Sequence, residues 1–456
     1  MGRAYSSLPI EGEPIARTSH RWITQLKQVL TVLVLVLVGY YYGNLPSLTR
    51  MWTIRSEPDF SHLASHCADI LPIKSDSFVA RQQALAETLY ALKASAYIAE
   101  PGASAAYYAN LSGTAWHLSE RPLLLIVTPE VDEDNHVYAQ VSILTPSFEA
   151  TRAKLLSIPS ASKVAYPEWP EHVDPYAVAL SVINQSNNGP IYVDGASRLF
   201  IRDGLQQVVS HSVVQSAPTE IRRLRERKSE EELEIMKCAN EVTLLSIRAA
   251  REYMYIGIHE SEAGALVTKA MSAAGLRGSF ALSLFAENAA LPHGSGTDKV
   301  LGKSDLILID CGGTLHGYES DVTRTFALDD SDIPFWTLAY WRLVLNAQTV
   351  ALITAVNGTI TAEVDQAARN ALGVSAMYFT HRLGHGIGLE GHESPYLTGG
   401  SKDVILTGHT FSNEPGIYVE GLLGIRLEDC FYIDTDGQPV YLTAKVGGQA
   451  KTPWLL

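Results

Sequence analysis

Positive charge and cysteine are both scarce in this chain of 456 residues. Lysine and arginine number 35 against 49 aspartates and glutamates, which leaves a net charge of −14 at pH 7. A nucleic-acid-binding protein needs a basic face, so the composition argues against that function. The chain has four scattered cysteines and no Cys-x-x-Cys pair, which argues against a zinc knuckle and against a disulfide scaffold. These cysteines are Cys67, Cys238, Cys311 and Cys430.

One stretch near the N terminus lacks charge altogether. No charged residue occurs from Gln28 to Thr49, and the centre of this stretch reads VLTVLVLVLVGYYYG. Its length is enough to cross about 30 Å of hydrocarbon, and its three tyrosines suit a membrane interface. We therefore expect a cytosolic tail over residues 1–27, a transmembrane signal-anchor over 28–49 and a stalk over 50–67.

This anchor would place the rest of the chain in the lumen or outside the cell. A cleaved signal peptide, and hence a secreted protein, is the main alternative, and a buried strand or core helix is another. Asn-x-Ser/Thr triplets at Asn110, Asn184 and Asn357 are compatible with a glycoprotein on a secretory route.

Residues 68–215 alternate between helical and strand patterns. SFVARQQALAETLYALKA spaces its apolar residues as a helix does. RPLLLIVTP, VYAQVSIL and PIYVD are short apolar runs bounded by turn residues, which is typical of buried strands. The pattern predicts an α/β domain that ends near residue 216.

Residues 216–456 show helices first and strands afterwards. Ser229 and Glu232 form a capping box, which predicts the start of a helix. DLILID and DVTRTFAL form one predicted hairpin, and TFSNEPGIYVE and GIRLEDCFYI form another. This order predicts an α+β domain around an antiparallel sheet.

Acidic residues inside these apolar strands are the main anomaly of the sequence. They are Asp310, Asp321, Glu414 and Glu428. A buried carboxylate without a partner costs several kcal/mol or becomes protonated. The arginines of the same strands, Arg324 and Arg426, cannot neutralise four carboxylates, whereas a pair of divalent cations could.

A segment rich in histidine and glycine supplies further candidates. THRLGHGIGLEGHESPY, residues 380–396, contains His381, His385 and His392. Glycine lets the backbone pass close to another group, and histidine at neutral pH is a base or a metal ligand. Carboxylates with one imidazole suit Mn²⁺, Co²⁺ or Zn²⁺. The segment alone does not show which histidine has which role.

The C-terminal domain resembles the pita-bread metallopeptidases, and within them the branch of aminopeptidase P, prolidase and creatinase. IDCGGTLHGYESDVTRTF resembles the family's segment with two metal aspartates, and HRLGHGIGLEGHE resembles its HxxGHxxG segment. EPGIY resembles its ExGxY motif and RLEDC its RxED motif. The resemblance implies five metal ligands, which are Asp310, Asp321, His385, Glu414 and Glu428. The N-terminal domain resembles the smaller creatinase-like α/β domain of this branch.

The resemblance also implies roles around the metals. His293 and His392 would contact the substrate or the tetrahedral intermediate, and His381 would line the cleft. Arg426 would hold a ligand carboxylate in place, and Glu414 would also move a proton to the leaving nitrogen. Tyr418 is the tyrosine of the ExGxY motif and is included among the catalytic candidates.

The function implied is a dinuclear metal-dependent hydrolase that cleaves Xaa-Pro peptide bonds, with a metal-bridged hydroxide as nucleophile. Mn²⁺ is the preferred ion, with Co²⁺ and Zn²⁺ as alternatives. The expected partners are a small peptide with proline at its second position, the membrane through the N-terminal anchor, and a second copy of the chain in a homodimer.

Three other functions are weaker interpretations. The same fold could act as a hydrolase or lyase on a small non-peptide substrate, or as a non-catalytic binding module. The non-catalytic binding module is disfavoured because no expected metal ligand is missing. Ser295 has no surrounding GxSxG motif, which argues against a serine hydrolase.

Overall fold

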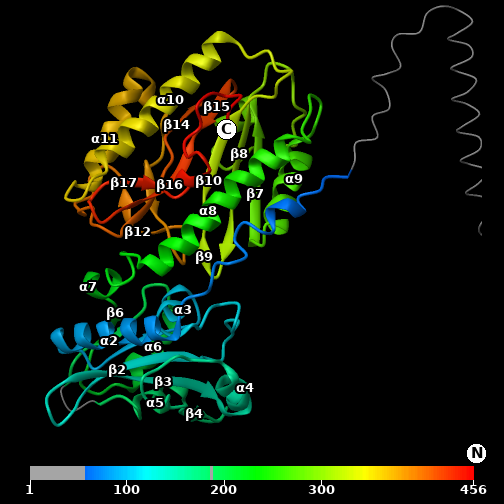
Figure 1. The fold of residues 1–456 in the computed structure, drawn as a ribbon. Helices are drawn as coiled ribbons and strands as arrows, with labels where there is room; N and C mark the ends of the chain where they lie inside the picture. Colours follow the sequence, from blue (N-terminus) through cyan, green and yellow to red (C-terminus); the bar gives the residue numbers. More distant parts are fainter. Residues whose placement is uncertain (1–56, 185–187) are drawn as a thin grey trace, which may run out of the picture. The chain divides into compact units, whose positions relative to one another are not determined.

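The computed structural model describes residues 57–184 and 188–456, and Pro58–Leu456 form one compact unit (Figure 1). Within these ranges, no helix is both sufficiently long and sufficiently apolar to cross a membrane. The predicted tail over 1–27, the predicted anchor over 28–49 and residues 50–56 of the predicted stalk lie outside the described residues.

The N-terminal domain contains a mixed six-stranded sheet in the order β4-β3-β2-β1-β5-β6. Its strands are β1 Ala96–Ala99, β2 Leu124–Val131, β3 Val137–Pro146, β4 Glu168–Trp169, β5 Ile191–Val193 and β6 Val214–Ser216. Its helices are α2 Ser75–Ala91, α3 Ala103–Ala109, α4 Ala150–Leu155, α5 Pro175–Leu180 and α6 Leu199–Val208. β2 is antiparallel to β1 and β3, whereas β5 is parallel to β1 and β6.

The strands of this domain are apolar on both faces. Leu125 and Val127 of β2 pack in one hydrophobic cluster with Leu85 and Leu89 of α2. The alternate residues of β2 belong to a second cluster, which includes Ile201 of α6. Helices therefore cover both faces of the sheet, which explains the continuous apolar runs and confirms the predicted α/β domain.

The C-terminal domain is built around a curled antiparallel sheet of nine strands (Figure 1). Its main path is β12-β11-β13-β16-β10-β8-β7, with β17 paired to β16 and β9 paired to β8. These strands are β7 Arg277–Phe285, β8 Ile307–Leu315, β9 Tyr318–Glu319, β10 Val322–Phe326, β11 Gly384–Gly386, β12 Glu393–Leu397, β13 Thr410–Asn413, β16 Glu428–Ile433 and β17 Pro439–Tyr441. A separate hairpin joins β14 Gly416–Val419 to β15 Leu423–Arg426.

Helices pack on this sheet in two groups. They are α8 Glu230–Arg251, α9 Glu260–Ala273, α10 Phe335–Thr354 and α11 Thr361–Leu372. The short helix α7 Thr219–Arg222 instead packs on the N-terminal domain through Ile221. One hydrophobic cluster joins α8 and α9 to β8 and β10, and another joins α10 and α11 to β12, β13 and β16. The predicted capping box is confirmed at the start of α8, where Ser229 and Glu232 bond each other's backbone N–H. The pairing of β8 with β10 confirms the first predicted hairpin.

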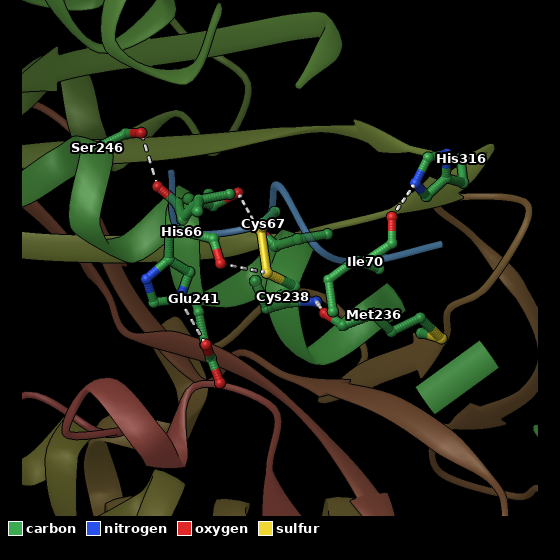
Figure 2. The surroundings of a disulfide bond; sticks show 12 residues. His66, Cys67, Ile70, Met236, Cys238, Glu241, Ser246 and His316 are labelled. Carbon is green, nitrogen blue, oxygen red and sulfur yellow. Dashed lines mark hydrogen bonds and ion pairs between the residues drawn. A yellow bond between two sulfur atoms is a disulfide. The ribbon is translucent and has the colours of Figure 1, made fainter. Parts of the chain in front are cut away.

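The segment before the N-terminal domain packs on the C-terminal domain. Phe60, Leu63 and Cys67 belong to the same hydrophobic cluster as α8 and α9. Cys67 forms a disulfide with Cys238 of α8 (Figure 2). Residues 58–67, which we expected in a stalk, are therefore part of the folded unit.

The disulfide corrects the expectation drawn from cysteine spacing. Cys67 and Cys238 are 171 positions apart in the sequence, so no local motif could pair them. Beside the disulfide, Nε2 of His66 lies 2.7 Å from Oε2 of Glu241 (Figure 2). The two free cysteines of the described chain are both buried.

Candidate metal centre

The structure brings the five predicted ligands together on neighbouring strands. Asp310 lies in β8, Asp321 directly before β10, His385 in β11, Glu414 directly after β13, and Glu428 at the start of β16. In the sheet these strands follow one another in the order β11-β13-β16-β10-β8. Residues spread over more than 100 positions of sequence therefore meet at one place because the strands that carry them are paired.

Two sets of ligand atoms overlap at Glu428. The carboxylates of Asp310, Asp321 and Glu428 have one oxygen each within 4.8 Å of one another. His385, Glu414 and Glu428 satisfy the same limit. Two sets that share a carboxylate could hold a pair of divalent cations, and Glu428 would belong to both sets.

The carboxylates are crowded enough to change their acidity. Burial and the neighbouring Asp310 raise the pKa of Asp321 well above its usual value. Burial and Asp321 do the same to the pKa of Glu428. Burial also opposes ionisation of Glu414, but the hydrogen bond and charge of His385, together with the charges of His381 and Arg426, outweigh burial and lower the pKa to about 2. The imidazole of His385 and the guanidinium of Arg426 cannot neutralise four carboxylates, so the remaining negative charge of the cluster fits bound cations.

Hydrogen bonds fix the orientation of the imidazole. Nδ1 of His385 donates to the Gly386 carbonyl at 3.1 Å, which leaves Nε2 facing the carboxylates. This Nε2 lies 3.3 Å from Oε1 of Glu414 and 3.7 Å from Oδ2 of Asp321. Ser412 donates to Glu414 Oε1 at 3.2 Å and accepts from the His385 backbone N–H at 3.1 Å. Sequence reasoning missed Ser412, although its position two residues before Glu414 in β13 was a usable signal.

A second group of hydrogen bonds orients the carboxylates of Asp310 and Glu428. Arg426 donates to Asp310 Oδ2 at 2.6 Å and to the Tyr418 hydroxyl at 3.1 Å. The hydroxyl of Thr323 accepts from Nε of Arg426 at 3.2 Å and donates to Glu428 Oε2 at 2.7 Å. Thr323 was also missed, although it is the direct cross-strand partner of Glu428. Such partners orient metal ligands and tune their basicity.

His381 belongs to this bonded network. Its Nδ1 donates to the Arg382 carbonyl at 2.7 Å, so its Nε2 accepts from the Tyr418 hydroxyl at 2.8 Å. Burial lowers the pKa of His381, which agrees with a neutral ring. Burial raises the pKa of Tyr418 to about 12, so the phenol stays protonated. Tyr418 therefore links His381 to Arg426.

The other two histidines lie at the exposed side of the centre. The His392 ring is 4.1 Å from the His385 ring, centroid to centroid. Partial burial of its ring, together with His385, lowers the pKa of His392. His293 is exposed and close enough to contribute to the same shift. The structure thus places both near the centre but leaves them open to a substrate.

Glycines allow β11 to pass between its two neighbours. A Cβ atom on Gly384 would lie 2.1 Å from the Ser412 carbonyl oxygen, which belongs to β13. A Cβ atom on Gly386 would lie 2.6 Å from the Glu393 carbonyl oxygen, which belongs to β12. No side chain fits at either position, which explains why glycine flanks His385 on both sides.

A cavity of about 330 Å³ adjoins His392. Its wall includes Tyr396 and Glu390 of the C-terminal domain, and Glu100 and Asp194 at the ends of β1 and β5. The volume is at the small end of ligand pockets, which span about 300–1,000 Å³.

The fold and the donor set are those of a metallopeptidase, and residues 234–435 match metallopeptidase family M24. The chain is 34% identical over 406 residues to an uncharacterized peptidase of Schizosaccharomyces pombe, and the match covers 87% of each chain. This chain belongs to family M24. Membership implies a dinuclear metal centre, which the five ligand-type residues fit.

Two other relatives indicate the kind of peptidase. A Xaa-Pro dipeptidase of Pyrococcus horikoshii is 35% identical over 221 residues, which is 48% of this chain and 62% of the relative. The crystal structure of dipeptidase PepE from Mycobacterium ulcerans superposes with a TM-score of 0.72 at 26% identity, and covers 85% of this chain and 99% of that chain. The protein is therefore a hydrolase similar to dipeptidases and prolidases, and its pita-bread-like C-terminal fold agrees with the expectation from its motifs.

Proposed function

We propose that this protein hydrolyses Xaa-Pro bonds in small peptides, with two Mn²⁺ ions held by the five ligand residues. The observation that carries the proposal is the sharing of Glu428 between two sets of ligand atoms. The small cavity beside His392 supports a short peptide as substrate. The printed name of the Pyrococcus relative supports proline specificity.

When bound, such a pair of ions would act as a Lewis acid and activate water. Residues of the chain itself would stabilise the developing charge, transfer the proton and orient the metal ligands. His293 and His392, on the open side, would donate hydrogen bonds to the oxygen on which negative charge develops. Glu414 would take up a proton and pass it to the leaving nitrogen. Arg426 and Thr323 would keep Asp310 and Glu428 in the geometry required.

We also propose that the folded unit resides in the lumen or outside the cell, attached by residues 28–49 or released from them. Two independent observations support this. The uncharged N-terminal stretch is long enough to span a bilayer. The Cys67–Cys238 disulfide is of a kind that persists in oxidising compartments.

The test combines metal analysis with two substrates on the full chain purified in detergent. We expect two ions per chain and hydrolysis of Xaa-Pro dipeptides, Xaa-Pro-Xaa tripeptides or both. The ratio of the two rates separates a dipeptidase from an aminopeptidase. Two bound ions with no hydrolysis of either peptide would overturn the proposed function and favour a small non-peptide substrate.

A further inference from the structure

The loop that carries His392 joins two strands of the sheet that forms the metal centre. Residues 387–392 connect β11, which contains His385, to β12, which begins at Glu393. The residue His392 is exposed, and its ring lies beside the His385 ring, so packing alone gives its position little support. The loop must be held by other contacts if this imidazole is to meet a substrate in a defined place.

One such contact is a buried ion pair between Glu393 and Lys228. Lys228 lies in the linker, residues 217–229, that joins the two domains. Its Nζ is 2.6 Å from Oε1 of Glu393, and the two side chains are only 2% and 3% exposed. The same Nζ donates to the backbone carbonyls of Arg225 and Glu226 at 3.1 Å each, so all three ammonium protons are bonded. A pair this deeply buried holds its partners firmly, because separating them would leave an uncompensated charge.

Two further contacts join the same linker to the same loop. Arg225 forms an ion pair with Glu390, and its Nη2 also lies 3.6 Å from Oε2 of Glu393. The Ser394 hydroxyl donates to Oε1 of Glu226 at 2.7 Å. The linker therefore bonds to the chain two residues before His392 and one to two residues after it.

We propose that Arg225 and Lys228 are positioning residues, which act by holding His392 in place beside the metal centre. The role rests on the proposed function, since it gives the linker the task of placing an imidazole that meets the substrate. A reacting group displaced by about 1 Å can lose about 100-fold in rate, so a loop held from both sides has a direct catalytic consequence. The linker thus contributes to the site although none of its residues belongs to the ligand set.

The first experiment compares loop dynamics in variants of the full, metal-loaded chain. The variants are Arg225→Gln, Glu390→Gln and the double variant Lys228→Met with Glu393→Met. The double variant removes both buried charges together, which keeps the interior free of an unpaired charge and preserves the fold. Hydrogen exchange of residues 387–392, followed by mass spectrometry, should accelerate about 10-fold or more, as expected when a local opening becomes easier.

The control is Arg223→Gln. Arg223 is an exposed cation of the same linker, and its ion-pair partner is Asp403, outside the loop. Exchange of residues 387–392 should be unchanged in this variant. Unchanged exchange in Arg225→Gln and in the double variant would overturn the positioning role. This readout needs no substrate, so it remains decisive even if the enzyme fails to cleave Xaa-Pro peptides.

The second experiment is a double-mutant cycle with His392→Ala, scored on an Xaa-Pro peptide. In the wild-type background we expect Arg225→Gln to lower kcat about 10- to 100-fold with two ions still bound, as for other residues that orient a site. In the His392→Ala background the same substitution should cost less than about 2-fold, because residues in one network are not additive. Equal losses in both backgrounds would show a general structural role and overturn the proposal.

Discussion

Acidic side chains have protein partners in one sheet of this protein and crowd against one another in the other sheet. In the N-terminal sheet, Glu100 and Asp194 lie just beyond the ends of β1 and β5, and both are paired. Arg198 binds Glu100 through Nη2 at 2.6 Å, and the hydroxyls of Tyr97 and Ser104 donate to Asp194. In the C-terminal sheet, carboxylates from four adjacent strands face one another with too little positive charge nearby. The carboxylates of the first sheet have protein partners, whereas those of the second sheet fit bound cations.

Among the substitutions that test this contrast, Asp321→Asn has the largest expected effect. Removing one carboxylate from the shared set should abolish binding of both ions and reduce turnover at least about 1,000-fold, because the metals stabilise the transition state by several kcal/mol. Metal analysis and the Xaa-Pro assay measure the two effects. Full metal content with unchanged turnover would show that the centre is wrongly assigned.

The matched control is Asp194→Asn in the other sheet. Its carboxylate is also bonded and close to a strand end, but it belongs to no set of ligand atoms. We expect a modest loss of stability and an unchanged metal content.

A milder change in the C-terminal sheet is Thr323→Val, which preserves shape and removes the hydroxyl that bonds Glu428 and Arg426. Loss of such a partner typically lowers metal affinity or activity about 10- to 100-fold. Metal titration and kcat measure it. Thr325→Val is the control on the same strand, since its hydroxyl bonds the Arg426 backbone and no ligand carboxylate. Equal losses of metal affinity in the two variants would show that Thr323 has no special role.

The segment before both sheets should affect stability alone. Cys67→Ser with Cys238→Ser removes a crosslink between positions 171 apart, and crosslinks of long loops contribute about 2–5 kcal/mol. We expect a lower Tm and unchanged kcat at temperatures where the variant is folded. Lost metal or activity in the folded variant would show that this segment supports the centre directly. The control is Cys311→Ala, a buried cysteine without a disulfide partner.

The sequence predicted those features of the structure that depend on a local pattern of residues. Short apolar runs bounded by turn residues predicted strands, and Ser229 with Glu232 predicted the start of α8. The carboxylates within strands and the resemblance pointed to the residues that the structure brings together. Pairing between distant positions was not predictable in the same way. The Cys67–Cys238 disulfide, the bond of Thr323 to Glu428 and the grip of the linker on Glu393 all depend on how strands and helices pack, which no single stretch of sequence contains.

The smallest expected effect compares one chemical change in the two sheets. Tyr418→Phe removes a buried hydroxyl that links His381 to Arg426 beside the metal centre. Tyr97→Phe removes a buried hydroxyl that donates to Asp194 at 2.8 Å in the N-terminal sheet. Tyr418→Phe should cost about 1–3 kcal/mol in the free energy of unfolding, because Nε2 of His381 loses its partner. Tyr97→Phe should cost about 1 kcal/mol, because Ser104 still donates to Asp194. Only Tyr418→Phe should also reduce kcat, by less than about 10-fold, as expected for one hydrogen bond of about 1 kcal/mol. Urea unfolding and steady-state kinetics measure the two effects, and an equal loss of kcat in both variants would contradict the division of roles between the sheets.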